Sequence, residues 1–594
     1  MPHTRPVSAI VDFADEVDSL PVRRRFVSPV RELRADALGE VIPTLDEADR
    51  LARSGLWLVG FVSYDASPAF DAAYSSHRDE RVPLAWFAAF DRPESVVAGD
   101  YDARAARADD RAHSLMPVSA VADREHHAGV RRVRDYIAAG DVYQVNLTVP
   151  FTSPSALSPA ALYERLLAAQ RGRYSAHLDF GDLQIMSASP ELFFERRGST
   201  VRSRPMKGTA ARGLSSAADG VVRRALEHSE KERAENVMIV DVARNDIGRI
   251  ARAGTVRVSA LCEAERYPRV WQLTSTIEGE VDAALPLSRV FEALFPPASI
   301  TGAPKIRAAS IVRELEHSPR AVYCGAIGMI RPGGDATFNV AIRTAWSADG
   351  GRTVRLDTGG GITTDSTAAG ELAELRTKLI AFTVPALRPT LFETIRMEHG
   401  RPVRLDRHLA RMAASADYFA LPFDAARATE AVNGAGAELR HAPVARCRLT
   451  LAPNDFPTAS AQPFDDPLAG SAPRSVALCQ EPVHRGDLRL YHKTTDRAPY
   501  ERALAAAGTV FDVLLWNEAY EATELSRGNL VAEIDGARWT PSLQCGLLGG
   551  TLRAELLESG TIRERVLTLD EVTAAERLWF INSLRGWVPI TLRA

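Results

Sequence analysis

The chain has 594 residues, of which 46% are apolar and 25% are charged, and its formal net charge is -4. This length exceeds what one hydrophobic core usually supports, so we expect three or more domains or one unusually large one. The near-neutral charge points to no nucleic-acid or membrane partner, and we find neither a signal peptide nor a run of about 18 apolar residues, so we expect a cytoplasmic protein.

The first 115 residues read as antiparallel strands, because short apolar runs at 56–62 and 84–90 alternate with polar turns. Between residues 119 and 382, long amphipathic helices alternate with β-prone runs. This is an α+β pattern. The five cysteines are scattered without a CxxC spacing and give no metal-binding framework.

A domain boundary is expected close to residue 388. A helix ends near Phe382, Pro385 and Pro389 follow, and a strand-like run begins at Leu391. We therefore predict a large α+β domain over residues 1–388, with an N-terminal part at 1–115 and a core at 119–382, and a second domain over residues 389–594.

Lysine is rare in this chain. Arginine replaces lysine on solvated surfaces but cannot lose its proton, so it serves neither as a nucleophile nor in a Schiff base. The few lysines therefore mark positions where an amine is needed, although biased base composition with accidental survivors is an alternative. Of the 72 basic residues only five are lysine, and all lie in motifs described below: Lys207, Lys231, Lys305, Lys378 and Lys493.

Residues 187–213 contain two β-prone runs around a turn at residues 198–200. If that turn is a three-residue hairpin loop, Glu191 lies directly opposite Lys207, with Cβ atoms roughly 5 Å apart. A carboxylate so placed could take the proton of the ammonium and free a nucleophilic nitrogen. A cross-strand salt bridge is the alternative, and a register shift of one residue would separate the pair.

Two pairs of glutamates are expected on helices, Glu232 with Glu235 and Glu371 with Glu374. The spacing of three residues places both carboxylates of a pair on one helix face. Two such faces brought together suit Mg²⁺, which prefers oxygen ligands, whereas the alternative is two solvated faces. A glycine triplet at residues 359–361, expected to be a loop, could bind an anion through its backbone N–H groups.

Together with further motifs, these features make the chain resemble component I of aminodeoxychorismate synthase. That enzyme belongs to the family that also holds anthranilate, isochorismate and salicylate synthases. The motifs follow the family's order over residues 119–382, and the N-terminal 115 residues match more loosely. The matching segments are residues 140–147, 189–191, 205–209, 231–249, 299–307, 323–325, 339–343, 359–362 and 365–378.

The resemblance implies a Mg²⁺ site and a chorismate site in the first domain. Glu235 and Glu374 would bind Mg²⁺ directly, and Glu232 and Glu371 would bind it through water. Three further motif residues, Thr301, Lys305 and Lys231, could equally have a structural role. The residues that the resemblance assigns to the substrate are Tyr323, Arg343, Gly359, Gly360, Gly361, Thr301, Lys378 and Gln144.

Three positions in this resemblance bear on the reaction. Gln144 stands where salicylate and isochorismate synthases have a lysine base, which argues against water as the nucleophile. Lys207 stands where anthranilate synthases have alanine, and aminodeoxychorismate synthases use this lysine to attack C2 of chorismate, with Glu191 as general acid and base. Gln272 stands where many members have histidine, so it cannot take part in proton transfer.

The second domain has a single lysine, Lys493, and so one candidate for a Schiff base with pyridoxal phosphate. Downstream, Glu524 could protonate the pyridine nitrogen, and glycine-rich amides at 546–550 with an arginine could hold the phosphate. Taken singly, a lone lysine is more often a surface residue, and such glycine patterns are common turns.

With the motifs at 391–396, 408–411 and 580–586, this domain resembles the class IV aminotransferase-like fold, a two-lobed α+β pyridoxal phosphate fold of type IV. The greatest resemblance is to aminodeoxychorismate lyase. It implies Lys493 as Schiff-base lysine and proton shuttle, Glu524 at the pyridine nitrogen, and Arg411 with the amides of Gly550 and Thr551 on the phosphate. Class IV also includes transaminases, so only the fusion to the first domain favours the lyase.

The expected enzyme is bifunctional, converting chorismate and ammonia to p-aminobenzoate and pyruvate with Mg²⁺ and pyridoxal 5'-phosphate. The sequence contains no glutaminase signature, so we expect a separate glutamine amidotransferase subunit or free ammonia. Class IV domains generally act as dimers, which suggests a homodimer through residues 389–594. Two alternatives stay open: an anthranilate-type enzyme with an attached transaminase, and a non-catalytic C-terminal dimerisation module.

Overall fold

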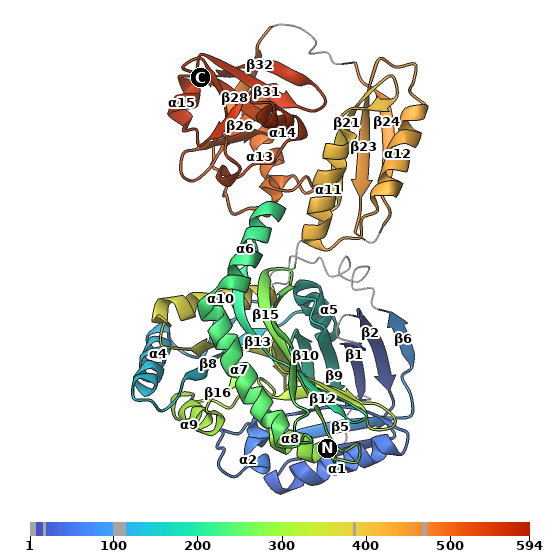
Figure 1. The fold of residues 1–594 in the computed structure, drawn as a ribbon, viewed down its shortest axis with the longest axis vertical. Coiled ribbons are helices and arrows are strands. Elements are labelled where there is room, and N and C mark those ends of the chain that lie inside the picture. The colour runs from blue at the N-terminus through green and yellow to red at the C-terminus, as the bar shows by residue number, and fades with distance from the viewer. Residues whose placement is uncertain are drawn as a thin grey trace. The chain divides into compact units, whose positions relative to one another are not determined.

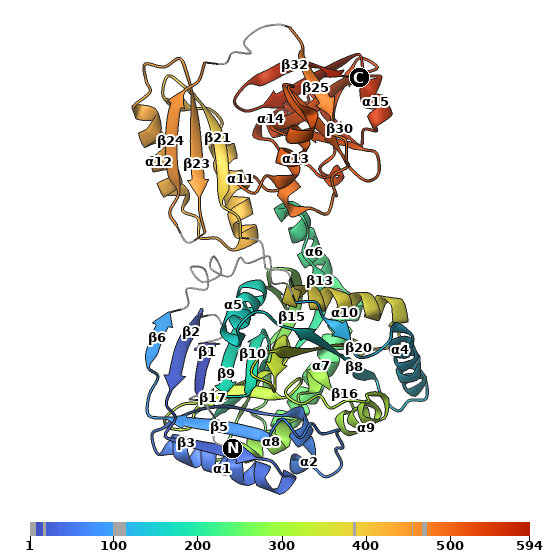
Figure 2. The ribbon, with the colours of Figure 1, turned by 180° about the vertical axis from the view of Figure 1, so that it is seen from behind.

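The computed structural model describes residues 7–15, 19–98, 115–383, 388–453, 455–465 and 472–593. They form two compact units, one of Met1–Arg212 with Arg223–Ala386 and one of Gly213–Val222 with Leu387–Ala594. Figures 1 and 2 show the fold from opposite sides. None of the described helices is long and apolar enough to cross a membrane.

The first unit contains two antiparallel sheets of ten strands each. Sheet A is built from the N-terminal strands and from the strands that flank the glycine triplet. In sheet order its strands are β16 (Gly302–Ala303), β8 (Gln144–Pro154), β20 (Thr353–Ile362), β19 (Thr344–Ser347), β10 (Leu183–Ser189), β9 (Tyr174–Phe180), β1 (Ser8–Ala14), β2 (Pro21–Val27) and β6 (Ser95–Ala98), with β7 (Val118–Ser119) paired to β8.

Sheet B joins the segment that carries Lys207 to the other N-terminal strands. In sheet order its strands are β13 (Met206–Ala211), β15 (Val270–Glu280), β12 (Thr200–Arg204), β11 (Leu192–Arg197), β18 (Ala336–Val340), β17 (Ala326–Ile330), β4 (Trp57–Val62), β5 (Ala85–Phe90) and β3 (Arg31–Ala35), with β14 (Arg257–Arg266) paired to β15.

The two sheets pack face to face, and helices cover their outer faces (Figures 1 and 2). Apolar side chains of both sheets, including Phe61, Trp86 and Leu178, form the core between them. The helices over sheet B are α1 (Leu38–Arg53), α7 (Glu230–Gly248) and α8 (Leu287–Leu294), and those over sheet A are α5 (Pro159–Gln170) and α10 (Ala368–Thr383). Two more helices, α4 (Asp123–Ala138) and α9 (Lys305–Leu315), pack on β8.

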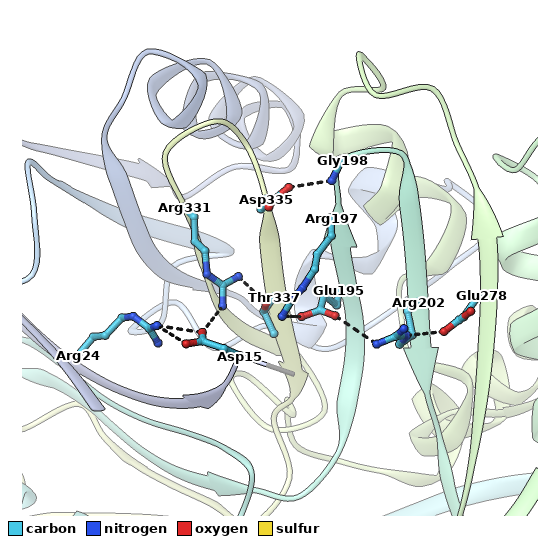
Figure 3. Close-up of polar contacts among 10 residues, drawn as sticks. All are labelled: Asp15, Arg24, Glu195, Arg197, Gly198, Arg202, Glu278, Arg331, Asp335 and Thr337. Atoms are coloured by element: carbon cyan, nitrogen blue, oxygen red, sulfur yellow. Dashed lines mark hydrogen bonds and ion pairs between the residues drawn. The ribbon is translucent and has the colours of Figure 1, made fainter. Parts of the chain in front are cut away.

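A row of alternating charges crosses sheet B (Figure 3). Glu195, Arg202 and Glu278 lie opposite one another on three neighbouring strands. Arg202 Nε donates to Glu278 Oε1 at 2.7 Å, and Arg257 Nη2 donates to Glu278 Oε2 at 2.9 Å. Burial alone would raise the pKa of Glu278, but the hydrogen bonds and charges of the two arginines hold it below its ordinary value. The row therefore favours this strand register over shifted ones.

The second unit has two lobes. In the first lobe, α11 (Leu405–Phe419) and α12 (Ala425–Ala437) pack on one face of the four-stranded antiparallel sheet C. The strands of sheet C, in order, are β22 (Arg401–Pro402), β21 (Leu391–Glu398), β23 (Val444–Leu451) and β24 (Thr458–Pro463).

The second lobe is the eight-stranded sheet D, which mixes parallel and antiparallel pairs. A pairing of β27 with β28 closes part of it into a barrel around an apolar core. Its strands, in order, are β27 (Ala522–Leu525), β26 (Asp512–Trp516), β25 (Arg474–Leu478), β32 (Gly586–Arg593), β31 (Arg577–Asn582), β28 (Gly528–Ile534), β29 (Ala537–Pro541) and β30 (Arg563–Arg565). The helices of this lobe are α13 (Ala498–Ala507), α14 (Thr551–Glu558) and α15 (Leu569–Thr573).

The predicted α+β class is correct for both units, and the runs at 56–62 and 84–90 are strands β4 and β5. Two expectations were wrong. Helix α1 lies between the N-terminal strands, where we expected strands and turns alone. The glycine triplet is the end of β20 and not a loop, because Gly359, Gly360 and Gly361 pair with residues 146–148 of β8.

Candidate active sites

A cavity of about 200 Å³ lies in the first unit, between the end of β20 and the faces of α7 and α10. It is lined mainly by polar side chains. They include Lys207, Glu191, the four glutamates of the predicted Mg²⁺ site, Tyr323, Arg343, Lys378, Gln272, Asn146 and Ser299.

The backbone of Lys207 is fixed by the amide of Asn236 on α7. Asn236 Nδ2 donates to Lys207 O at 3.0 Å and to Leu273 O at 3.3 Å. Burial and the charge of Lys378 lower the pKa of the Lys207 amine, although Glu235, Glu191 and Glu374 act in the opposite direction. A lowered pKa increases the fraction of free, nucleophilic amine at neutral pH.

Gly361 leaves room for this amine. A Cβ atom at Gly361 would lie 2.6 Å from Lys207 Nζ and 2.6 Å from Gln144 Nε2. Gln144 is fully buried, and within the described residues neither its Nε2 nor its Oε1 has a hydrogen-bond partner. The amine and this buried amide therefore meet at the glycine, where a substrate group would satisfy both.

Glu191 shares the cavity with Lys207, but the two are not cross-strand partners. The hairpin turn has two residues, Gly198 and Ser199, so Arg197 pairs with Thr200 and the register differs by one from the prediction. A bulge in β11 shifts the register further, and after Pro205 the chain continues as β13, which pairs with β15. Lys207 and Glu191 therefore line the same cavity but are not paired residues of neighbouring strands.

Glu191 is poised to exchange protons near neutral pH. Its side chain is almost fully buried, and burial raises its pKa to about 7, against the hydrogen bond with Ser299 and the charge of Lys207. Met206 N approaches Glu191 Oε1 at 3.4 Å. A carboxyl group with such a pKa can both donate and accept a proton at neutral pH.

The four predicted metal ligands line the same cavity from two helices, Glu232 and Glu235 on α7 and Glu371 and Glu374 on α10. Burial raises the pKa of Glu235, and the charges of Glu232 and Glu371 add to this against the nearby lysines. Glu374 instead pairs with Lys378, at 2.6 Å from its Nζ.

This carboxylate set fits a Mg²⁺ ion that keeps several waters. Among the described residues, no group of three or more His, Cys, Asp or Glu side chains could hold a metal ion by itself. Mg²⁺ usually takes one or two protein carboxylates and completes its shell with water and substrate oxygens. The mutual repulsion of Glu235 and Glu371 is the kind that a divalent cation relieves.

The other predicted substrate residues surround these groups. Arg343, which has φ of +53°, donates from Nη1 to Lys378 O at 3.2 Å, and Lys378 Nζ donates to Gly359 O at 2.7 Å. Tyr323, Gly359 and Lys378 line the cavity. Thr301 does not, and its hydroxyl donates to Pro297 O at 2.9 Å, which favours a structural role.

A second cavity, of about 570 Å³, lies in the second unit between sheet C and the barrel of sheet D. Lys493 enters it from the segment before α13, and the Lys493 carbonyl accepts a hydrogen bond from Phe392 N of β21 at 3.1 Å. Burial and the charge of Arg411 lower the pKa of the Lys493 amine to about 8. Such an amine is partly unprotonated at neutral pH, as Schiff-base formation requires.

Glu524 lies on β27, lines this cavity and is almost fully buried. Its Oε1 accepts hydrogen bonds from Tyr500 Oη at 2.7 Å and from Leu548 N at 3.1 Å. Burial raises the pKa of Glu524 to about 7 in spite of these bonds. A carboxylate held in this way would bind a protonated ring nitrogen, as pyridoxal phosphate requires.

The predicted phosphate ligands lie together at the start of α14. Arg411 Nη1 donates to Gly549 O at 3.0 Å, and a Cβ atom at Gly550 would lie 2.0 Å from Asn529 Oδ1. The amides of Gly550 and Thr551 begin the helix, where backbone N–H groups attract anions. Arg411, Gly550 and Thr551 line the same cavity as Lys493, so the donor set fits pyridoxal phosphate.

A buried carboxylate orients Arg411. Glu393 on β21 accepts from Arg411 Nε at 2.8 Å and from Arg411 Nη2 at 2.6 Å, and it lies 2.7 Å from His408 Nδ1. Burial would raise the pKa of Glu393, but the charge of Arg411 and the hydrogen bonds lower it to about 2. These two bonds and the bond to Gly549 O use three of the five guanidinium N–H groups of Arg411, which leaves two for a ligand.

A family model for chorismate binding enzymes matches residues 13–384. The chain belongs to this family. A second model, for amino-transferase class IV, matches residues 390–592. The resemblance that the motifs indicated is therefore confirmed in both parts of the chain.

Curated relatives of this chorismate binding enzyme divide between two activities. Aminodeoxychorismate synthase component 1 of Bacillus subtilis is 38% identical over 252 residues, which are 42% of this chain and 53% of that protein. Anthranilate synthase component 1 of Streptomyces coelicolor is 42% identical over 246 residues, 41% of this chain and 48% of that protein. The chain thus spans about half the length of these relatives, and identity does not choose between the activities.

The fold of the first unit has a solved counterpart. Anthranilate synthase component I from Streptococcus pneumoniae is 26% identical, with a TM-score of 0.50, over 64% of this chain and 91% of that chain. This likeness agrees with the two packed sheets that hold the first cavity.

Sequence reasoning missed several residues in both sites of this chorismate binding enzyme. Asn236 and Ser299, which orient Lys207 and Glu191, lie in matched motifs but have no chemistry that a motif reveals. Glu393 and His408 lie within the motifs at 391–396 and 408–411, and this position was their signal. In the structure Glu393 pairs with both His408 and Arg411. Tyr500, the donor to Glu524, had no signal at all.

Proposed function

We propose that the first unit aminates chorismate to 4-amino-4-deoxychorismate and that the second eliminates pyruvate from this product to give p-aminobenzoate. The observation that carries the proposal is the amine of Lys207 beside Gly361, in a cavity with Glu191 and four carboxylates. A chorismate enzyme that uses ammonia alone has no need for an amine at this position.

In the amination, Mg²⁺ would neutralise a carboxylate of chorismate, held by Glu235 and Glu374 directly and by Glu232 and Glu371 through water. Tyr323, Arg343 and the amides of the glycine triplet would bind the substrate carboxylates. The edge of β20 beyond Leu356 has no pairing with β19, which leaves backbone N–H groups there for the substrate.

Lys207 would attack C2 of chorismate as the C4 hydroxyl departs, with Glu191 donating the proton that makes water. That attack shifts both ring double bonds. Ammonia would then form a bond at C4 while the bond from C2 to the lysine nitrogen breaks and both ring double bonds return to their original positions. Glu191 takes up a proton from the attacking amine. Its pKa of about 7 suits both roles.

In the second unit, bound pyridoxal phosphate would supply an electron sink for the charge that develops at C4 of the substrate. Lys493 would remove the C4 proton, and the enolpyruvyl oxygen would leave as pyruvate, which makes the ring aromatic. Glu524 would hold the ring nitrogen of the cofactor, while Arg411, Gly550 and Thr551 would hold its phosphate. Lys493 is the single lysine of residues 389–594, so the proton transfer falls to it.

The proposal extends to partners and place. Ammonia would come from a separate glutamine amidotransferase subunit or from solution, the second unit would form a homodimer, and the reaction would serve folate synthesis in the cytoplasm. An anthranilate-type reaction is the second candidate, favoured by the 42% identity to the Streptomyces coelicolor enzyme.

The identity of the aromatic product tests the proposal. The purified chain is incubated with chorismate, Mg²⁺, ammonium and pyridoxal phosphate, and the products are separated by chromatography. We expect p-aminobenzoate and an equal amount of pyruvate. Anthranilate would favour the second candidate, and accumulation of aminodeoxychorismate would make the second unit a non-catalytic module.

A further inference from the structure

One face of sheet C carries cationic side chains into the second cavity. Strand β23 alternates between residues buried against α11 and α12 and residues on the opposite face, as the period of two in a strand requires. Arg446 and Arg448 are exposed on that opposite face and line the cavity that holds Lys493.

These two arginines have no anionic partner among the described residues. Their cross-strand neighbours on β24, Ser460 and Gln462, are neutral. Three other arginines of the cavity pair with acidic residues: Arg411 with Glu393, Arg527 with Asp512 and Arg553 with Glu564. Arg497 donates to the carbonyl oxygen of Ser526, and Arg585 lies over the ring of Phe464. Two unpaired guanidinium groups therefore face a cavity that also contains the reactive amine.

Arg448 and Lys493 both lie beside the phenyl ring of Phe392. The Arg448 guanidinium carbon lies 4.3 Å from the ring centroid, and Lys493 Nζ lies 4.7 Å from it. Arg446 follows on the same face, about 7 Å along the strand. A substrate whose amine reaches Lys493 thus has its remaining atoms beside two cations at a spacing that suits two carboxylates of one small ring.

We propose that Arg446 and Arg448 recognise the two carboxylates of a cyclic dicarboxylate amine and so determine the substrate of the second unit. This inference rests on the proposed lyase reaction, whose substrate carries a ring carboxylate and an enolpyruvyl carboxylate. Arginine binds carboxylates through paired, charge-assisted hydrogen bonds. Loss of pyruvate leaves one carboxylate, so the product would be held by one arginine and released more readily.

Binding of two probes to the full chain loaded with pyridoxal phosphate tests the inference. Isophthalate has two carboxylates on one ring and benzoate has one, and their affinities are measured by calorimetry and by the visible absorbance of the cofactor. We expect isophthalate to bind the parent about 10-fold or more tightly than benzoate, and Arg446→Gln or Arg448→Gln to remove that difference. Cofactor content should not change.

Turnover gives the second readout. With aminodeoxychorismate supplied directly, each variant should raise KM about 10-fold or more and leave kcat within about threefold. Arg396→Gln is the matched control, since Arg396 lies opposite Arg446 but pairs with Glu398 and does not line the cavity. It should behave as the parent.

The outcomes separate this inference from the proposed function. If the parent makes p-aminobenzoate but neither variant alters KM or isophthalate binding, the arginines do not recognise carboxylates and the lyase assignment stands. If the parent makes no p-aminobenzoate but its isophthalate affinity depends on both arginines, the lyase assignment fails and the carboxylate site stands. An equal loss in Arg396→Gln would overturn the inference, because the effect would then be general to sheet C.

Discussion

Gly361→Ala should slow amination of chorismate on the order of 100-fold while the chain stays folded. The new Cβ would lie 2.6 Å from both Lys207 Nζ and Gln144 Nε2. Non-bonded heavy atoms pack at about 3.5 Å or more, so the lysine amine must move by roughly 1 Å. Gly361 lies in β20 without a positive φ, so alanine fits the backbone there. The fold should lose only about 1–3 kcal/mol, because both neighbours are ends of flexible side chains.

The substitution should mainly lower the rate of amination. A misplacement of about 1 Å in a reacting group lowers the rate by on the order of 100-fold, or about 2.7 kcal/mol in the activation free energy. The assay is p-aminobenzoate formation from chorismate and ammonium, beside turnover of added aminodeoxychorismate, which should be unchanged. Gly39→Ala is the matched control, since a Cβ there meets no atom within 4 Å. A kcat for Gly361→Ala within threefold of the parent would refute this reasoning.

Three further predictions concern the first unit. Glu235→Gln or Glu374→Gln should abolish chorismate turnover and spare the lyase step, because an amide is a poor Mg²⁺ ligand; near-normal turnover would remove the metal assignment. Lys207→Ala should lose aminodeoxychorismate formation, with any residual amination at C2 giving anthranilate; full activity would exclude a covalent intermediate. The pKa of Glu278 is lowered in the folded protein. Its contribution to the free energy of unfolding is therefore present above pH 4.5, its ordinary pKa, and is lost as the pH falls through the lowered pKa. Glu278→Gln should therefore reduce the free energy of unfolding by about 1–2 kcal/mol at pH 7, with the difference shrinking below about pH 4 in urea titrations; a difference independent of pH would contradict the ion-pair row.

Local sequence patterns predicted the helices that carry the glutamate pairs, because helical periodicity and spacing are contained in a few residues. They did not predict the geometry between Glu191 and Lys207. That depends on a two-residue turn, a bulge in β11 and the strand change after Pro205, and each shifts the register by an amount that composition does not encode. The pair still meets because both residues line one cavity.

The scarcity of lysine predicted the second site better than local sequence patterns did. The sequence alone singles out Lys493, because no other lysine exists in its domain. It does not single out the free arginines of β23, since the chain is rich in arginine and only tertiary packing tells a paired guanidinium from an unpaired one. The glycine triplet was also misjudged from sequence, because three glycines suggested a loop. The glycines lie in a strand, where the lack of a side chain at Gly361 lets Lys207 and Gln144 come close to the backbone.

The most direct test of a bifunctional chain is the product that Lys493→Ala makes. The variant is incubated with chorismate, ammonium, Mg²⁺ and pyridoxal phosphate, and the products are identified by mass spectrometry. We expect 4-amino-4-deoxychorismate to accumulate, with no p-aminobenzoate and little pyruvate, and we expect Lys493→Arg to behave alike because a guanidinium forms no Schiff base. If either variant made p-aminobenzoate at a rate comparable with the parent, the second unit would not be the lyase.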